Sequence, residues 1–337
     1  MIKVGLIGAG KMGISHLSIL GAHPEVEIVG VSDTSKMVLD VLKQYSSFQT
    51  FTNYEEMMEE AKPQAVFVAV PTKFHAAMIK NVLLRNKHVF AEKPLSTTVE
   101  EGRELVEIAQ TNNLVNQVGY HNKFIGTFQE AKVIIDNGYL GEIFHFTGES
   151  YGPLLIRAKQ NNWRSNPLEG GGCLMDYASH VIDLINYVLG PIEKIKGSIL
   201  KSFYSKNVED SVFSLLELKS KISGVLSVNW SDETYRKMST SLNIIGSKGK
   251  IICDANEFKV YFKTSDCPAN YSKGWNVRHI TDFTPPVNFY LRGEEYSAQV
   301  DYFIKAIQKK VPNTINNFQS AWNVDKVISL IRNSINN

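Results

Sequence analysis

The chain has 337 residues, of which 43% are hydrophobic, and it carries a formal net charge of +2 and three cysteines. This length predicts roughly two domains of about 150 residues, and the nearly balanced charge argues against nucleic acid or an anionic membrane as a partner. No run of about 18 apolar residues predicts a membrane span, and sparse cysteines without a C-x-x-C pair favour a reducing compartment such as the cytoplasm over a disulfide framework.

The first segment has the pattern of a strand, a glycine loop and a helix. Residues 2–7 are short, apolar and partly β-branched, as in a buried parallel strand. Gly8, Gly10 and Gly13 follow on G-x-G-x-x-G spacing, which suits a tight turn, a close approach to a pyrophosphate and close packing of the next helix. The pattern alone fits a glycine-rich turn equally well.

The second predicted strand, residues 26–32, ends at Asp33. An acidic residue at this point accepts hydrogen bonds from the ribose hydroxyls of a dinucleotide. Asp33 would also repel a 2′-phosphate, so we expect NAD as the cofactor. NADP is the alternative, because Ser35 and Lys36 are suited to bind that phosphate if Asp33 turns away.

Strands and helices then alternate up to about residue 120. This alternation predicts a doubly wound parallel sheet, a Rossmann domain, over residues 1–121. After Asp33 the predicted elements are a helix at 37–42, a strand at 48–51, a helix at 54–58, a strand at 65–70, a helix at 74–84, a strand at 88–91, a helix at 99–110 and a strand at 114–119.

The pattern changes in residues 122–337, where consecutive strands predict an α+β domain with a large, mostly antiparallel, open-faced sheet. Its free face suggests subunit contact in a homodimer or homotetramer, and the last helix is expected to pack back on the first domain. The predicted elements are helices at 127–137, 174–189, 299–307 and 321–331, strands at 143–151, 195–203, 212–218, 224–230, 239–245, 250–253 and 258–262, and an irregular polar segment at 153–167.

Glu92, Lys93 and Pro94 follow the predicted strand at 88–91. Ligands of open parallel sheets bind at the carboxyl ends of the strands. A lysine there is placed to donate to a substrate hydroxyl or carbonyl oxygen and to assist proton transfer. A surface lysine before a turn proline is the alternative interpretation.

Asp176 and His180 are four residues apart on the predicted helix 174–189, so both project from one face, and Asp183 lies near that face. A histidine oriented by a carboxylate is a good general acid or base near neutral pH, although such pairs are also ordinary surface ion pairs. The preceding glycines 170–172 favour a functional site, because they let another molecule approach closely. A metal site is disfavoured, since no His or Cys cluster has ligand spacing.

Several further residues are candidates for binding. His75 lies after the strand at 65–70, where it lines the cofactor site or serves a structural role at a helix start. Tyr120 and Asn122 open the second domain, and Trp163 and Arg164 precede the glycine run; they bind substrate or are ordinary surface residues.

Taken together, these motifs resemble the glucose–fructose oxidoreductase, inositol dehydrogenase and rhizopine-catabolism (Gfo/Idh/MocA) family of NAD(P)-dependent oxidoreductases, over nearly the whole chain. The resemblance is carried by residues 8–13 with His16, 70–72 with His75, 92–94, 118–124, and 170–172 with Asp176, His180 and Asp183. Two positions depart from it: Lys123 replaces a frequent arginine, and Ala178 replaces a frequent glycine.

The resemblance implies a dehydrogenase that moves a hydride between a secondary hydroxyl of a sugar, sugar derivative or cyclitol and the nicotinamide. An NAD-dependent glycosidase acting by transient oxidation and a non-catalytic dinucleotide or sugar sensor are the alternatives. The implied catalytic residues are Lys93, Asp176 and His180. The predicted cofactor-binding residues are Gly8, Gly10, Lys11, Met12, Gly13, Asp33, Pro71, Thr72, His75, Glu92 and Lys93. The predicted substrate-binding residues are Lys93, Tyr120, Asn122, Trp163, Arg164, Asp176 and His180.

Overall fold

A computed structural model describes residues 1–156, 163–283 and 293–334 of the chain. The chain forms two compact units, one combining Met1–His121 with Val287–Trp322 and the other combining Asn122–Pro286 with Asn323–Asn337. Part of the predicted irregular segment, residues 157–162, lies outside the described residues. Within the described ranges, no helix is long and apolar enough to cross a membrane.

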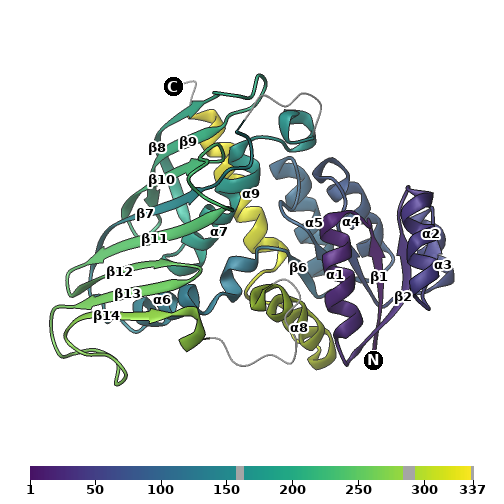
Figure 1. The fold of residues 1–337 in the computed structure, drawn as a ribbon, viewed down its shortest axis with the longest axis horizontal. Helices are drawn as coiled ribbons and strands as arrows, with labels where there is room; N and C mark the ends of the chain where they lie inside the picture. Colours follow the sequence, from purple (N-terminus) through teal and green to yellow (C-terminus); the bar gives the residue numbers. More distant parts are fainter. Residues whose placement is uncertain (157–162, 284–292, 335–337) are drawn as a thin grey trace. The chain divides into compact units, whose positions relative to one another are not determined.

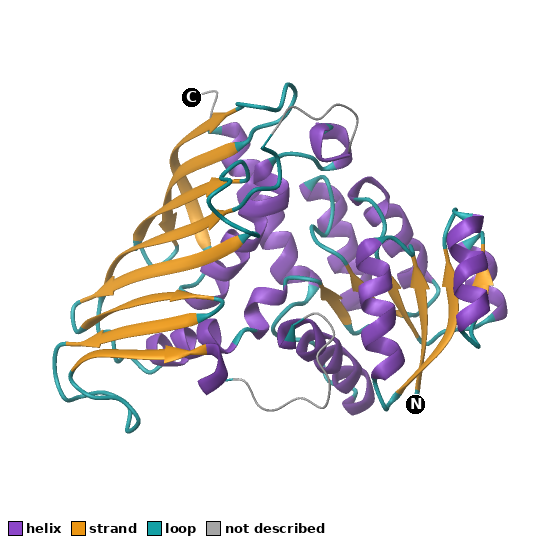
Figure 2. Ribbon diagram, viewed as in Figure 1, coloured by secondary structure: helices purple, strands orange, loops and turns teal. Residues whose placement is uncertain are grey.

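The first unit contains a six-stranded sheet in the order β3-β2-β1-β4-β5-β6, in which all the pairings are parallel. Figure 2 shows its strands among the helices that connect them. The strands are β1 (Ile2–Ile7), β2 (Val26–Ser32), β3 (Gln49–Phe51), β4 (Ala65–Val68), β5 (His88–Ala91) and β6 (Asn116–Val118). The helices are α1 (Lys11–Ala22), α2 (Lys36–Tyr45), α3 (Tyr54–Glu60), α4 (His75–Leu84), α5 (Val99–Thr111) and α8 (Glu294–Lys309). The predicted Rossmann sheet is confirmed.

The core of this unit joins the central strands to a helix from far along the chain. Phe67 of β4 and Phe90 of β5 stack with ring centroids 4.5 Å apart. Phe303 of α8 meets both rings edge-on, at 5.6 and 5.8 Å. The sequence analysis placed this helix in the second domain, whereas its apolar face packs against the first sheet.

The second unit is organised around an eight-stranded sheet in the order β14-β13-β12-β11-β7-β10-β9-β8. Helices α6 and α7 lie on one face of it, and Figure 1 shows no described helix on the other face. The strands are β7 (Ile143–Tyr151), β8 (Ile192–Lys201), β9 (Ser211–Leu218), β10 (Ser223–Asn229), β11 (Ser239–Gly246), β12 (Gly249–Asp254), β13 (Glu257–Phe262) and β14 (Gly274–His279). The helices are α6 (Gly126–Asp136), α7 (Ser179–Val188) and α9 (Phe318–Asn333), whose first residues belong to the first unit.

The large sheet is mostly antiparallel, as predicted, and differs from the prediction in three details. Strands β7 and β10 pair in parallel. Strand β14 was not predicted, because none of its six residues is buried and its apolar pattern is limited to Trp275 and Val277. The predicted helix 174–189 begins with a π-helical turn, Leu174–Ala178, before α7.

Candidate active site

The glycine loop lies between β1 and α1, and each glycine has a different steric reason. Gly8 has a φ of +94°, and a Cβ there would lie 2.5 Å from the carbonyl oxygen of Ala69. A Cβ at Gly13 would collide with the carbonyl of Gly8, so this glycine lets α1 pack on the loop. A Cβ at Gly10 would meet no atom within 4 Å. The open space at Gly10, beside the N–H groups of the first turn of α1, fits a diphosphate.

Asp33, after β2, is held against the glycine loop. Its Oδ2 accepts a hydrogen bond from the Ala9 N–H at 2.7 Å, and its Oδ1 accepts one from the Ser35 N–H at 2.8 Å. A carboxylate has about four acceptor positions, so both oxygens keep capacity for ribose hydroxyls. The loop and this carboxylate therefore fit the adenosine and diphosphate part of NAD.

Two further candidates stand after β4. Thr72 is buried, whereas Pro71 is exposed. The His75 ring is 1% exposed, with Nδ1 2.7 Å from the carbonyl oxygen of Pro94 and Nε2 2.9 Å from that of Val70. Burial is the main cause that lowers the pKa of His75. The histidine therefore connects the loops after β4 and β5, which favours its structural interpretation.

Lys93 stands just beyond β5 and is half-buried. Because the sheet order is β1-β4-β5, Lys93 lies at the same carboxyl edge as the glycine loop, two strands away. The preceding carboxylate, Glu92, is engaged by His16 of α1, whose Nε2 lies 2.6 Å from Glu92 Oε1. His16 belongs with the motif of residues 8–13, but nothing in the sequence pointed to this contact.

In the second unit, glycines 170–172 precede the π-helical turn. They were predicted to let another molecule approach closely, but the structure gives them a different role. A Cβ at Gly171 would collide with the backbone of Arg164, and a Cβ at Gly172 would collide with the carboxylate of Glu209. Glu209 also accepts the Leu174 N–H on Oε1 at 2.8 Å. The glycines therefore admit the chain's own atoms. No local signal in the sequence pointed to Glu209, which holds the start of this helix.

Asp176 lies in the π-helical turn and is 8% exposed, while His180 lies in the first turn of α7 and is 4% exposed. The Nε of Arg164 donates to Asp176 Oδ2 at 3.0 Å. The Arg164 guanidinium in turn stacks on Trp163, 4.4 Å from the ring centroid. The structure thus brings together three of the predicted substrate-site residues, and π-helical turns are frequent at functional sites.

Residues 120–123, at the junction between the units along the chain, are also mostly buried. Tyr120 is 0% and Asn122 4% exposed, and Asn122 Nδ2 has no hydrogen-bond partner. Lys123 is 2% exposed, and its Nζ lies 2.7 Å from Asp183 Oδ1. Burial raises the pKa of Asp183 to about 6, although Lys123 opposes this change. Lys123 and Asp183 therefore form a buried ion pair, one turn after His180.

A hollow of about 960 Å³ in the first unit opens at the amino ends of β1, β5 and β6, opposite the edge that carries the glycine loop. It is lined by none of the predicted site residues. Among the described side chains, no group of three or more His, Cys, Asp or Glu is arranged to hold a metal ion.

These features define a dinucleotide-binding protein with a Rossmann unit and a second unit built on a large, mostly antiparallel sheet. Residues 2–120 match the model of an oxidoreductase family with an NAD-binding Rossmann fold, and residues 128–252 match the model of the GFO/IDH/MocA C-terminal domain. The two matches together include more than half of the chain. The chain therefore belongs to the GFO/IDH/MocA family of oxidoreductases, which confirms the resemblance and the predicted enzyme class and NAD-binding fold.

Relatives in this family share modest identity with the chain. The myo-inositol 2-dehydrogenase of Thermotoga maritima is 24% identical over 266 residues, which are 75% of this chain and 75% of that protein. The D-glucoside 3-dehydrogenase of Escherichia coli is 30% identical over 194 residues, 56% of this chain and 54% of that protein. A solved structure of levoglucosan dehydrogenase in complex with NADH has a TM-score of 0.89 at 21% identity, covering 99% of this chain and 96% of that one. This last likeness shows the fold. In some curated relatives the match covers only about half of each protein.

Proposed function

We propose that the protein is an NAD-dependent dehydrogenase for a secondary hydroxyl of a sugar, sugar derivative or cyclitol. The observation that carries this proposal is the position of Lys93, a cation at the carboxyl edge of the sheet that also presents the glycine loop and Asp33. The dehydrogenases of myo-inositol and D-glucoside among the relatives support the substrate class.

Each catalytic candidate has a distinct task in this proposal. Lys93 donates a hydrogen bond to the substrate oxygen and stabilises negative charge that develops there. His180 takes the hydroxyl proton during oxidation and returns it during reduction. Asp176, anchored by Arg164, orients substrate or His180. NAD, when bound, accepts the hydride; the protein supplies alignment and charge.

Substrate selection would involve Trp163 and Arg164, with Tyr120 and Asn122. The buried Nδ2 of Asn122, which has no hydrogen-bond partner, supports a role in binding a polar ligand. The Arg164 side chain is 39% exposed, and its stacking on Trp163 holds the guanidinium plane in place.

The preference for NAD over NADP rests on Asp33. Two backbone N–H groups fix its carboxylate beside the loop, which opposes the turn that a 2′-phosphate would require. Cofactor binding would also involve Lys11, Met12, Pro71 and Thr72.

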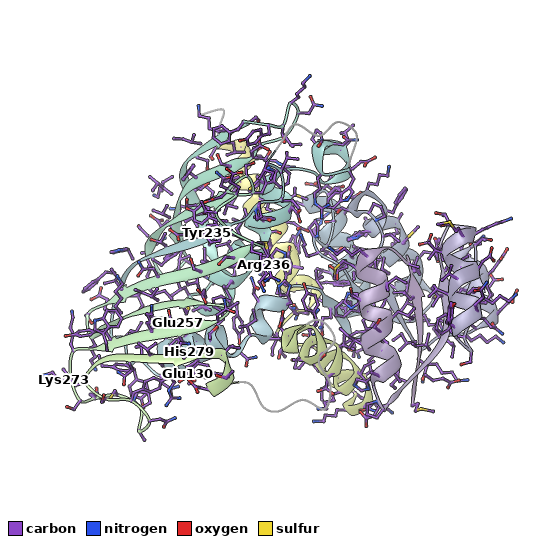
Figure 3. The ribbon with its side chains drawn as sticks, in the orientation of Figure 1. Glu130, Tyr235, Arg236, Glu257, Lys273 and His279 are labelled. Atoms are coloured by element: carbon purple, nitrogen blue, oxygen red, sulfur yellow. The ribbon has the colours of Figure 1, made fainter. Side chains whose placement is uncertain are left out.

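The protein would act as a homodimer or homotetramer in the cytoplasm. The uncovered face of the large sheet presents exposed apolar residues, which are Ile199, Phe213, Leu215, Trp275 and Val277. Figure 3 labels Glu257 and His279, which pair across β13 and β14 near one edge of this sheet. Apolar side chains on an uncovered sheet face favour a second copy as cover. The three cysteines are free thiols, which supports a reducing compartment.

A screen of sugars, polyols and cyclitols with NAD⁺, followed by the absorbance of NADH, tests the proposal. We expect reversible NADH formation with at least one sugar or cyclitol. Release of free sugar without net NADH would indicate a glycosidase instead, and binding of NAD⁺ without turnover of any compound in the panel would contradict the proposed reaction.

A further inference from the structure

A histidine and a carboxylate form a largely buried pair at the residue before Lys93. His16 is on α1, three residues after Gly13, and Glu92 directly follows β5. The His16 Nε2 lies 2.6 Å from Glu92 Oε1, and the two side chains are 1% and 12% exposed.

Aromatic rings fix the His16 imidazole. Its centroid lies 5.6 Å from that of Phe67 on β4 and 5.0 Å from that of Phe90 on β5. Phe303 contacts the same two rings from α8. Because protein interiors are closely packed, the ring has little freedom to rotate, and Nε2 stays directed at Glu92.

The Glu92 carboxylate is fixed as well. Its Oε2 accepts the backbone N–H of Lys93 at 3.3 Å. A Cβ at Gly119 would lie 3.2 Å from each carboxylate oxygen, so the carboxylate packs against this glycine. The carboxylate therefore has a single orientation, defined by His16 on one oxygen and Lys93 on the other.

The charge state of Glu92 follows from its neighbours. Burial raises the pKa of Glu92, but the hydrogen bond with His16 and the electrostatic interactions with His16, Lys93 and His121 outweigh burial, so the net pKa lies below its usual value. His75 also interacts electrostatically with Glu92. A buried anion thus stands next to Lys93.

Stability alone is a weak reason for such a pair. Replacing a buried ion pair by apolar side chains of similar volume is often neutral or stabilising. An apolar contact between α1 and β5 would hold the helix equally well, since Phe67 and Phe90 already surround the position. What an apolar contact cannot supply is a fixed negative charge beside the lysine.

We propose that His16 and Glu92 are positioning residues for Lys93: His16 orients the Glu92 carboxylate, and this carboxylate fixes the Lys93 backbone and keeps a negative charge in the neighbourhood of Lys93. The inference rests on the proposed function in one respect, the assignment of Lys93 to the substrate oxygen. Because α1 also presents the glycine loop, the pair connects the cofactor-binding segment to Lys93 within one unit.

Four variants test the pair. His16→Leu removes the donor, His16→Gln keeps a donor near the position of Nε2, and Glu92→Gln keeps the shape and removes the charge. His23→Leu is the matched control, because His23 ends the same helix and pairs with Asp301 at 3.4 Å, away from Lys93. For each, kcat and KM, the Kd for NADH by fluorescence and the melting temperature are measured.

We expect His16→Leu and Glu92→Gln to lower kcat and kcat/KM together by about 10²-fold, the effect of misplacing a reacting group. NADH binding to His16→Leu should stay within about threefold, His16→Gln should recover most of the rate, and His23→Leu should keep the wild-type rate. In a Lys93→Met background, His16→Leu should cause no further loss, because its effect passes through Lys93. Additive losses, or equal rates for His16→Gln and His16→Leu, would overturn the proposal.

A second measurement needs no turnover and separates this inference from the proposed function. Lysines are acetylated with limiting acetic anhydride and quantified by peptide mass spectrometry, with Lys11 as an internal reference. Glu92 carries a negative charge that interacts with Lys93, so Glu92→Gln should raise the relative labelling of Lys93 about threefold or more. Unchanged labelling would refute the pair's role even if no substrate is found, whereas increased labelling without any turnover would contradict only the reaction.

Discussion

The buried pair Lys123–Asp183 gives the sharpest stability prediction. The two side chains are 3% and 1% exposed, and 2.7 Å separates Nζ from Oδ1. In Lys123→Met, a carboxylate remains buried without its cation, which costs about 3–5 kcal/mol. For a unit of this size, each kcal/mol lowers the melting temperature by about 2–4 °C, so the decrease should be about 6–20 °C. The double variant Lys123→Met/Asp183→Leu should recover much of it.

Urea unfolding at several pH values is the assay, with fluorescence of Trp163, Trp230 and Trp275 as a probe of the second unit. The folded pKa of Asp183, about 6, lies above its unfolded value, so its contribution to stability is present at low pH and decreases as pH rises through about 6. The decrease in the free energy of unfolding caused by Lys123→Met should therefore be larger at pH 8 than at pH 5. Lys132→Met is the control, because Lys132 approaches the same Tyr187 ring but pairs with Asp136 at the surface, and should cost less than about 1 kcal/mol. Equal losses for both lysine variants, or a loss that does not depend on pH, would refute the explanation by charge burial.

Five further variants have expected outcomes. Gly10→Val should leave the melting temperature nearly unchanged but weaken NADH binding at least about 100-fold, measured by fluorescence titration, because its side chain fills the open space beside the loop. His180→Ala should lower kcat by about 10²- to 10⁴-fold with unchanged NADH affinity, and Lys93→Met should be at least as damaging in steady-state assays. Asp33→Ala should bring the dissociation constants for NADPH and NADH closer together. A wild-type protein that binds NADPH more tightly than NADH would contradict the predicted preference for NAD. Phe213→Asp should dissociate the oligomer in light scattering, whereas a monomeric wild type at micromolar concentration would contradict the sheet-face interface.

The first unit was predictable because its signals are local. Residues 65–68 are wholly buried, and a continuous apolar run has few alternatives to a parallel strand. Lys93 could be placed at the sheet edge by the same logic, since a residue just after a parallel strand lies at the carboxyl edge. Helix α8 could be predicted as a helix but not assigned to this unit, because only the packed core shows that Phe303 meets Phe67 and Phe90.

In the second unit, the features that the sequence did not predict depend on contacts between residues far apart in the chain. Strand β14 is exposed at a sheet edge and is defined by hydrogen bonds to β13, and Trp275 and Val277 give it only a short alternating pattern. Glu209 holds the start of a helix more than thirty residues earlier in the chain. In the sequence, Lys123 is distinguished only as a replacement for a frequent arginine, whereas in the structure its ammonium group pairs with Asp183. None of these relations has a fixed spacing that a single sequence could show.

The two glycine segments show how one sequence pattern can have opposite structural meanings. In each segment, glycines precede a helix that carries or adjoins candidate site residues. In each, the lack of a side chain at the glycine has either a functional or a steric reason. At Gly10, a Cβ would meet no atom of the protein within 4 Å. The glycine there leaves open space for a ligand. At Gly171 and Gly172 the same volume is filled by Arg164 and Glu209. Those contacts order the loop that brings Arg164 to Asp176. The first segment therefore contributes to binding directly, and the second contributes through the placement of a carboxylate.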